Sequence, residues 1–257
     1  MVPLEQKDRV LRRSDGRFTY FGVDIAYHCG KFERGYDRVI EVWGADHHGY
    51  IPRMRSALGV LGIDPGRIEF HLVQFATLYR DGEKVKMSTR AAEYVPLAVL
   101  RDEIGADACR YFYTAVGSDR HLEFDLTTAT SQSKENPVYY VQYAHARICS
   151  LFRHIGVDAP DPQADLSLLS GEAEQRLMAL LGTYPELIDS MARERRIHRL
   201  AHYLGDLARV FHGWYDSHRF RDDETALRDA RLALCGAVRQ VLANALGILG
   251  VSAPESM

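Results

Sequence analysis

Long apolar segments, paired cysteines and a secretory leader are all missing from this sequence. No apolar run approaches the roughly 20 residues that a helix needs to span a bilayer, so we expect no membrane partner. Residues 1–7 have neither the apolar core nor the small-residue cleavage site of a secretory signal. The four cysteines lack the paired spacing of a zinc or redox motif; they are Cys29, Cys109, Cys149 and Cys235. These absences favour a cytoplasmic protein whose cysteines are small buried residues.

A charge excess is missing as well. The 32 lysines and arginines are matched by 35 aspartates and glutamates, which leaves a formal net charge of −3. This balance excludes a strongly basic protein that binds nucleic acids non-specifically. One local basic run remains, at Arg193, Arg195, Arg196, His198 and Arg199. A solvated start of a helix is the favoured interpretation of this run, and a local basic patch stays open.

The composition is that of a globular protein, with 46% hydrophobic and 26% charged residues. The length of 257 residues suffices for one large domain or two ordinary ones. In the first half, β-rich runs at 18–21, 39–43 and 68–73 alternate with helical patterns at 25–32 and 51–61. Strands separated by helices predict a parallel α/β sheet.

Strand patterns end near residue 125, and helical patterns follow. Apolar residues recur at helical spacing, and the predicted helices are 127–154, 171–191, 196–220 and 223–249. Their apolar faces must pack together, which predicts a helical bundle. The expected fold class is therefore α/β followed by all-α.

A tyrosine and an aspartate four residues apart, Tyr20 and Asp24, follow the first predicted strand. A carboxylate near an aromatic hydroxyl suits a guanidinium or ammonium ligand, because a fork of N–H donors needs paired acceptors. Asp24 also stands where the N-cap of the helix 25–32 would stand. The cap is the favoured interpretation of this pattern alone, and the two roles do not exclude each other.

The second predicted strand ends in the segment WGADHHGY at 43–50, and open parallel sheets bind ligands at this edge. Gly44 lets a ligand approach the backbone, and Asp46 can accept hydrogen bonds from both hydroxyls of a ribose. A metal site at Asp46, His47 and His48 is the rival interpretation. Because adjacent histidines point apart and no further spaced ligands follow, we expect no metal site.

A third segment, LYRDGEKVKMSTR at 78–90, combines a turn with a basic loop. Asp81 and Gly82 predict a tight turn. The loop KMSTR at 86–90 offers cationic side chains and a hydroxyl, which can clamp the phosphates of ATP while pyrophosphate leaves. As a bare pentapeptide the loop is also compatible with an ordinary exposed basic loop.

Three further motifs make the pattern specific. They are GADACRYF at 105–112, ENPVYYVQYAHAR at 135–147 and the terminal LGVSAPESM at 249–257. With the earlier segments, in this order over nearly the whole chain, they resemble the arginyl-tRNA synthetases. The resemblance implies a Rossmann-type enzyme that uses ATP, with Mg²⁺, to join L-arginine to arginine tRNA through an arginyl-adenylate.

The resemblance also implies roles for individual residues. The arginine-binding residues would be Tyr20, Asp24 and His47. The ATP-binding residues would be Gly44, Asp46, Val73, Gln74 and Lys86. Catalytic contacts to the phosphates would come from Lys86, Ser88 and Arg90. The anticodon would meet Tyr143, Arg147, Tyr215 and Met257. Residues 1–130 would form the second half of the catalytic domain, and residues 131–257 the helical anticodon-binding domain.

The residues alone support part of the anticodon assignment. In the predicted helix that contains residues 138–152, the apolar residues expected to face the core form a stripe of Val141, Ala144, Ile148 and Leu151. Tyr143 and Arg147 lie off the stripe and, being four apart, next to each other. An exposed aromatic ring beside an arginine suits the stacking of unpaired bases. Tyr215 borders its own helix stripe, so core packing is a rival role for it.

One signature of these enzymes, a His-x-Gly-His motif, is absent. The nearest string, HIGV at 154–157, closes a predicted helix with Gly156 as its C-cap. We therefore expect a C-terminal fragment of an arginine–tRNA ligase, which a separate N-terminal polypeptide could complete. The alternative is a stand-alone module that binds the tRNA anticodon without catalytic activity.

Overall fold

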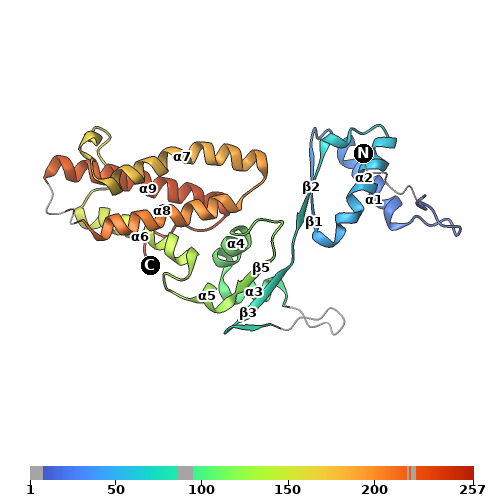
Figure 1. The fold of residues 1–257 in the computed structure, drawn as a ribbon, viewed down its shortest axis with the longest axis horizontal. Coiled ribbons are helices and arrows are strands. Elements are labelled where there is room, and N and C mark those ends of the chain that lie inside the picture. The colour runs from blue at the N-terminus through green and yellow to red at the C-terminus, as the bar shows by residue number, and fades with distance from the viewer. Residues whose placement is uncertain (1–7, 86–94, 219, 221–223) are drawn as a thin grey trace. The chain divides into compact units, whose positions relative to one another are not determined.

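The computed structural model describes residues 8–85, 95–218, 220 and 224–257. The chain forms two compact units (Figure 1). Each unit has its own cluster of buried apolar side chains. The first comprises Met1–Phe75 with Ser118–Arg120, and the second comprises Ala76–Gly117 with His121–Met257.

The first unit is built on two parallel strands, β1 (Val39–Gly44) and β2 (Ile68–Val73). In their register, Val39 lies opposite Ile68 and Gly44 opposite Val73. Two helices, α1 (Tyr20–Glu33) and α2 (Ile51–Val60), pack on the buried face of these strands. Short 3₁₀ segments, Ala45–Tyr50 and Pro65–Arg67, lead into α2 and β2. This arrangement confirms the predicted strands at 39–43 and 68–73.

The predicted strand at 18–21 is wrong, and so is the predicted cap at Asp24. Helix α1 already begins at Tyr20, because Thr19 is its N-cap and accepts a hydrogen bond from the Gly22 amide at 3.2 Å. Asp24 therefore lies inside the helix, and its carboxylate is not used for capping.

The second unit begins with a small mixed sheet that the sequence patterns did not predict. Strand β3 (Ala76–Arg80) pairs with β4 (Glu83–Lys84) in an antiparallel hairpin and with β5 (Leu122–Asp125) in parallel. Asp81 and Gly82 both have positive φ, at 51° and 79°, which confirms the tight turn. Three short helices complete this part, α3 (Leu97–Ile104), α4 (Ala106–Thr114) and α5 (Leu126–Thr130).

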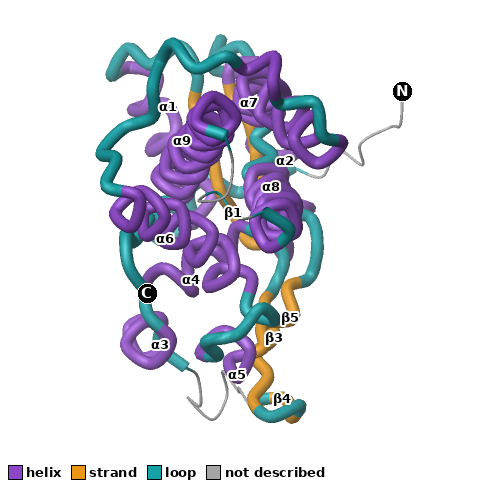
Figure 2. Tube along the Cα trace, turned by 90° about the vertical axis from the view of Figure 1, so that its left-hand side faces the viewer, coloured by secondary structure: helices purple, strands orange, loops and turns teal. Residues whose placement is uncertain are grey.

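Four long helices form the rest of the second unit and pack against one another (Figure 2). They are α6 (Pro137–Ile155), α7 (Glu172–Glu194), α8 (His198–Asp216) and α9 (Thr225–Leu249). The predicted single helix 127–154 is wrong, because α5 and α6 are separate. Pro137 can only start a helix, and Asn136 caps it by accepting a hydrogen bond from the Val138 amide at 3.2 Å.

One helix of the described residues, α9, contains an 18-residue window with a mean hydropathy of 1.6, which would suffice to cross a membrane by length and composition alone. The helix is not an uninterrupted apolar run, because Arg228, Asp229, Arg231 and Arg239 lie within it, so the expectation that no apolar run approaches 20 residues is not contradicted. Its buried side chains face the bundle, as in a core helix; they include Leu234, Val238, Leu242 and Leu246.

The basic run joins the end of α7 to the start of α8. Arg193 pairs with Asp189 at 2.9 Å, and Glu194 lies 3.7 Å from Arg196 and 3.4 Å from Arg199. These side chains are largely exposed, as expected for a solvated helix boundary.

The observed order, an α/β part with small parallel sheets followed by a helical region, confirms the predicted fold class. The four cysteines are free; Cys109, Cys149 and Cys235 are buried as predicted, whereas Cys29 is only partly buried. The predicted boundary between the catalytic part (residues 1–130) and the anticodon-binding part (residues 131–257) is a functional one. It differs from the division into compact units, and it stays a prediction.

Candidate functional site

Buried polar side chains fix α1 against β1 in the first unit. Glu41, on the covered face of β1, accepts a hydrogen bond from Lys31 and lies 3.4 Å from Nε2 of His28. Nδ1 of His28, whose side chain is 2% exposed, donates to the carbonyl of Asp24 at 2.7 Å. His28 and Lys31 thus tie the third turn of α1 to the strand, and the bond from His28 to the Asp24 carbonyl links Asp24, one turn earlier, to the same contacts.

Tyr20, Asp24 and Tyr50 gather where α1 meets the end of the 3₁₀ segment. The Tyr50 ring packs edge-on against Phe21, with 5.5 Å between centroids. Burial raises the pKa of the Tyr50 phenol to about 12, and the neighbouring Asp24 carboxylate and Tyr20 add to this effect. Two predicted arginine-binding residues therefore share one small region, and Tyr50 is a third member that the sequence patterns did not single out.

Four of the five predicted ATP-binding residues, Gly44, Asp46, Val73 and Gln74, lie at or just after the carboxyl ends of β1 and β2. Gly44 and Val73 end the two strands side by side, and Gln74 follows Val73. A Cβ at Gly44 would lie 2.6 Å from Oδ1 of Asp46, so the absence of a side chain there gives the Asp46 carboxylate its place. Nε2 of His47 lies 3.7 Å from Oδ2 of Asp46. This edge exposes a carboxylate and an imidazole to solvent.

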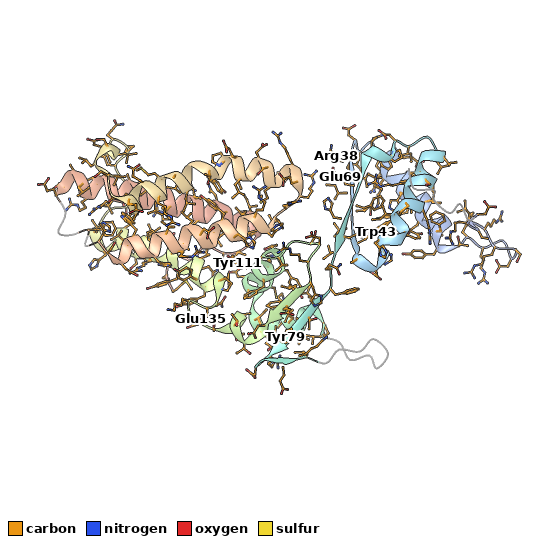
Figure 3. The ribbon with its side chains drawn as sticks, viewed as in Figure 1. Arg38, Trp43, Glu69, Tyr79, Tyr111 and Glu135 are labelled. Atoms are coloured by element: carbon orange, nitrogen blue, oxygen red, sulfur yellow. The ribbon has the colours of Figure 1, made fainter. Side chains whose placement is uncertain are left out.

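The side chain of Trp43, labelled in Figure 3, contacts one residue of each of these two groups. Its ring lies 5.7 Å from that of Tyr50 and 6.1 Å from that of His47. The indole also packs on Phe70 of β2 at 4.6 Å. The aromatic cluster therefore positions the carboxylate of Asp24 and the loop of Asp46 within one rigid neighbourhood, able to receive a cationic group beside a nucleoside.

The remaining predicted catalytic residues, Lys86, Ser88 and Arg90, lie outside the described residues. The hairpin of β3 and β4, which immediately precedes these residues, is part of the described structure. Arg80 of β3 donates to both carboxylate oxygens of Glu103, at 2.6 and 2.8 Å. The Asp81 amide donates to Oγ1 of Thr127 at 2.9 Å, so the hairpin is anchored on both sides.

In the second unit, α6 and α8 bring the predicted anticodon residues together. The guanidinium carbon of Arg147 lies 4.1 Å from the centroid of the Tyr215 ring and 5.9 Å from that of Tyr143. Tyr143 is 40% exposed, whereas the predicted core stripe of α6 is buried. Tyr139 lies parallel to Tyr143, with 6.2 Å between centroids. Together these residues, Tyr139, Tyr143, Arg147 and Tyr215, form a surface that we call the aromatic platform.

Two residues of α8 complete the platform, and the sequence patterns missed both. Asp216 accepts a hydrogen bond from Nη2 of Arg147. His212 is 6% exposed and lies nearly parallel to Tyr143, with 5.5 Å between centroids. In the sequence, the only indication of their role was that His212 and Asp216 are one helical turn apart. This spacing does not reveal which face of α8 meets α6.

The C-terminal segment is tied to α4 and α6. Asp107 accepts hydrogen bonds from the Ser252 amide at 3.1 Å and from the Gln142 side chain at 2.9 Å. His145 donates to the carbonyl of Pro254 at 2.8 Å. Met257 itself is 54% exposed, and its place in an anticodon contact stays a prediction.

Comparison with known proteins shows what this chain is similar to. The model of the DALR anticodon binding domain matches residues 141–257, which contain Tyr143, Arg147 and Tyr215 of the aromatic platform but not Tyr139. An arginine–tRNA ligase of Aromatoleum aromaticum is 58% identical over 254 residues, covering 98% of this chain. This chain is a homologue of that arginine–tRNA ligase over almost all of its own length. A solved arginyl-tRNA synthetase structure from Campylobacter jejuni agrees, with a TM-score of 0.88 and 35% identity over 98% of this chain and 55% of its own.

The arginyl-tRNA synthetase of Thermus thermophilus shows the same fold. It superposes on all of this chain and 52% of its own with a TM-score of 0.79, at 23% identity. The chain spans only about 43% of the length of the Aromatoleum relative. The similarity therefore extends over less than half of that relative.

Proposed function

We propose that this chain acts in an arginine–tRNA ligase, the ATP-dependent enzyme that attaches arginine to its tRNA. The observation that carries the proposal is the meeting of Gly44, Asp46 and Val73 at one strand edge, with Asp24 and Tyr50 on the adjoining helix and loop. The carboxyl edge of a parallel sheet is where such folds bind nucleotides. A carboxylate next to this edge suits the guanidinium of arginine.

The reaction has two steps. A carboxylate oxygen of arginine attacks the α-phosphorus of ATP, which forms arginyl-adenylate and releases pyrophosphate. A ribose hydroxyl at the 3′ end of the tRNA then attacks the activated carbonyl and releases AMP. Asp24 and Tyr20 would hold the guanidinium, and His47 would contact the bound arginine. Asp46 would accept the ribose hydroxyls of ATP, while Val73 and Gln74 border the adenine.

Lys86, Ser88 and Arg90 would meet the triphosphate and stabilise the charge that develops as pyrophosphate leaves. Mg²⁺ would arrive with ATP as part of the substrate. Among the described residues, no group of three or more His, Cys, Asp or Glu side chains is placed to hold a metal. We therefore derive no step through a protein-bound ion.

The aromatic platform would receive the anticodon of arginine tRNA. Tyr143 offers an exposed ring for stacking, and the match to the anticodon binding domain includes Tyr143, Arg147 and Tyr215. Stacking of one unpaired base on an aromatic side chain contributes about 1–3 kcal/mol. We place the reaction in the cytoplasm, where tRNA, arginine and ATP meet.

The direct test uses a second polypeptide that corresponds to the part of the related ligases that this chain does not cover. Mixed with this chain, arginine and arginine tRNA, it should give arginine-dependent exchange of pyrophosphate into ATP. A folded complex that shows no exchange would contradict the ligase proposal.

The second candidate is an anticodon-binding module without catalysis, which the platform alone would support. It predicts selective binding of arginine tRNA, weakened by Tyr143→Ala, together with no ATP binding. Equilibrium dialysis with labelled ATP in the presence of the completing polypeptide distinguishes the two candidates.

A further inference from the structure

Arg147 is fixed on several sides by residues of α8. Its Nη2 donates to Asp216, and its Nη1 lies 3.4 Å from Nδ1 of His212. The face of the guanidinium covers the ring of Tyr215. A guanidinium carries five N–H donors in a rigid plane, so these contacts leave donors available in one defined direction. The side chain of Arg147 keeps 24% of its surface exposed for a ligand.

The ion pair with Asp216 changes what Arg147 can recognise. A carboxylate at hydrogen-bond distance offsets the positive charge of the guanidinium, and the pair presents little net charge to the surroundings. A phosphate approaching Arg147 would also meet the negative charge of Asp216, whose side chain is 60% exposed. The oxygen or nitrogen acceptors of a neutral base meet no such repulsion.

His212 adds direction to this arrangement. Its Nε2 lies 3.3 Å from the carbonyl of Tyr140, which can only accept, so this nitrogen carries the proton. Nδ1 then has a lone pair that faces the N–H of Arg147, which can only donate. Burial lowers the pKa of His212, which keeps the ring neutral and preserves this acceptor. The imidazole also supports the inner side of the platform beside Tyr143.

We infer that Arg147 reads the edge of an unpaired anticodon base rather than a phosphate, and that Asp216 and His212 are the positioning residues that aim it. This inference rests on the proposed function, since it requires the platform to bind the anticodon. It specifies that Arg147 contacts a base, and it assigns positioning roles to Asp216 and His212.

The salt dependence of RNA binding separates a base contact from a phosphate contact. Each phosphate contact steepens the log–log dependence of affinity on salt by about 0.7–0.9. We would measure binding of a synthetic anticodon stem–loop of arginine tRNA, and of the same stem–loop with each anticodon base substituted, between about 50 and 200 mM salt. The variant pair R147Q/D216N removes both partners and leaves the net charge unchanged.

The expected result is an unchanged salt slope together with a loss of about tenfold or more in preference at one anticodon position. H212F keeps the Arg147–Asp216 pair and should lower the same preference without changing the slope. The matched control is R209Q/D206N, which removes another Arg–Asp pair of α8, separated by 2.7 Å, and should change neither quantity. Circular dichroism verifies that each variant is folded.

A slope shallower by about one in R147Q/D216N would overturn the inference, because it would reveal a phosphate contact. An unchanged preference at every position would overturn it as well. If the unsubstituted chain shows no preference for the arginine anticodon, the proposed function fails and the inference fails with it. Failure of the proposed function can be distinguished from failure of the inference alone, because it is observed with the unsubstituted chain.

Discussion

Glu174 of α7 and Arg231 of α9 form an ion pair of 2.8 Å, and both side chains are almost completely withdrawn from solvent. Glu174 also accepts a hydrogen bond from the Gly171 amide at 2.9 Å, which closes the first turn of α7. One carboxylate therefore caps a helix and joins it to the central helix of the bundle. Its two oxygens serve these two roles separately.

We expect Arg231→Met to lower the free energy of unfolding by about 3–5 kcal/mol, because it leaves the buried Glu174 charge without its partner. The measurement is urea denaturation followed by circular dichroism. Arg193→Met is the control, since its pair with Asp189 is exposed and should contribute no more than about 0.5 kcal/mol. Equal losses in the two variants would contradict the role assigned to the buried pair.

The same carboxylate predicts a pH dependence of stability. Burial alone would raise the pKa of Glu174, but the hydrogen bond from Gly171 and the pair with Arg231 outweigh it and hold the pKa below the ordinary value of 4.5. A lowered pKa in the folded state contributes stability that is fully present above about pH 4.5. This contribution is lost as the pH falls through the lower, folded-state pKa.

We therefore expect Glu174→Gln to be less stable than the unsubstituted chain near neutral pH, with a difference that shrinks in acid. Urea denaturation at a series of pH values checks this expectation. A difference that stays constant from neutral pH down to pH about 3 would show that Glu174 does not titrate with a lowered pKa.

The bundle was predictable because its signal is local. Apolar residues at helical spacing identify α7, α8 and α9 whatever they pack against, and a spacing of four predicts that Tyr143 and Arg147 are neighbours. Strands β3 and β5 carry no such signal. They are four or five residues long, and each is stabilised by a partner far away in the chain. Pairing of this kind leaves little trace in the periodicity of either segment.

The candidate site likewise has residues that were predictable from local sequence and residues that were not. Glycine and aspartate after a strand predict a ligand edge, and Gly44 and Asp46 lie there. Residues contributed by a second element were missed, because their relevance depends on which helix faces meet. His212 and Asp216 enter the platform only through the packing of α8 on α6. Asp24 was misinterpreted because Thr19, at an equally plausible position, takes the cap.

Tyr50 provides a test of the arginine pocket. Its hydroxyl is buried beside Asp24, and its ring packs between Phe21 and Trp43. Tyr50→Phe keeps the ring packing and removes one hydroxyl; a hydrogen bond between this hydroxyl and bound arginine would contribute about 1 kcal/mol net. In the completed enzyme we expect the KM for arginine to rise about fivefold, with the KM for ATP unchanged. A rise in both constants would indicate a general structural role instead.

Asp107 controls the order of the C-terminal segment, because it accepts hydrogen bonds from the amide of Ser252 and the side chain of Gln142. Asp107→Ala removes these acceptors, while Val251 keeps its backbone hydrogen bond to Leu246. We expect the amides after Val251 to exchange hydrogen for deuterium about tenfold faster, with little change within α6. Mass spectrometry of the C-terminal peptide measures this rate. Asp102→Ala is the control, because Asp102 is an exposed residue of α3 whose carboxylate contacts Arg101. If the two variants exchange alike, the contacts of Gln142, His145 and Arg153 suffice to hold the segment without Asp107.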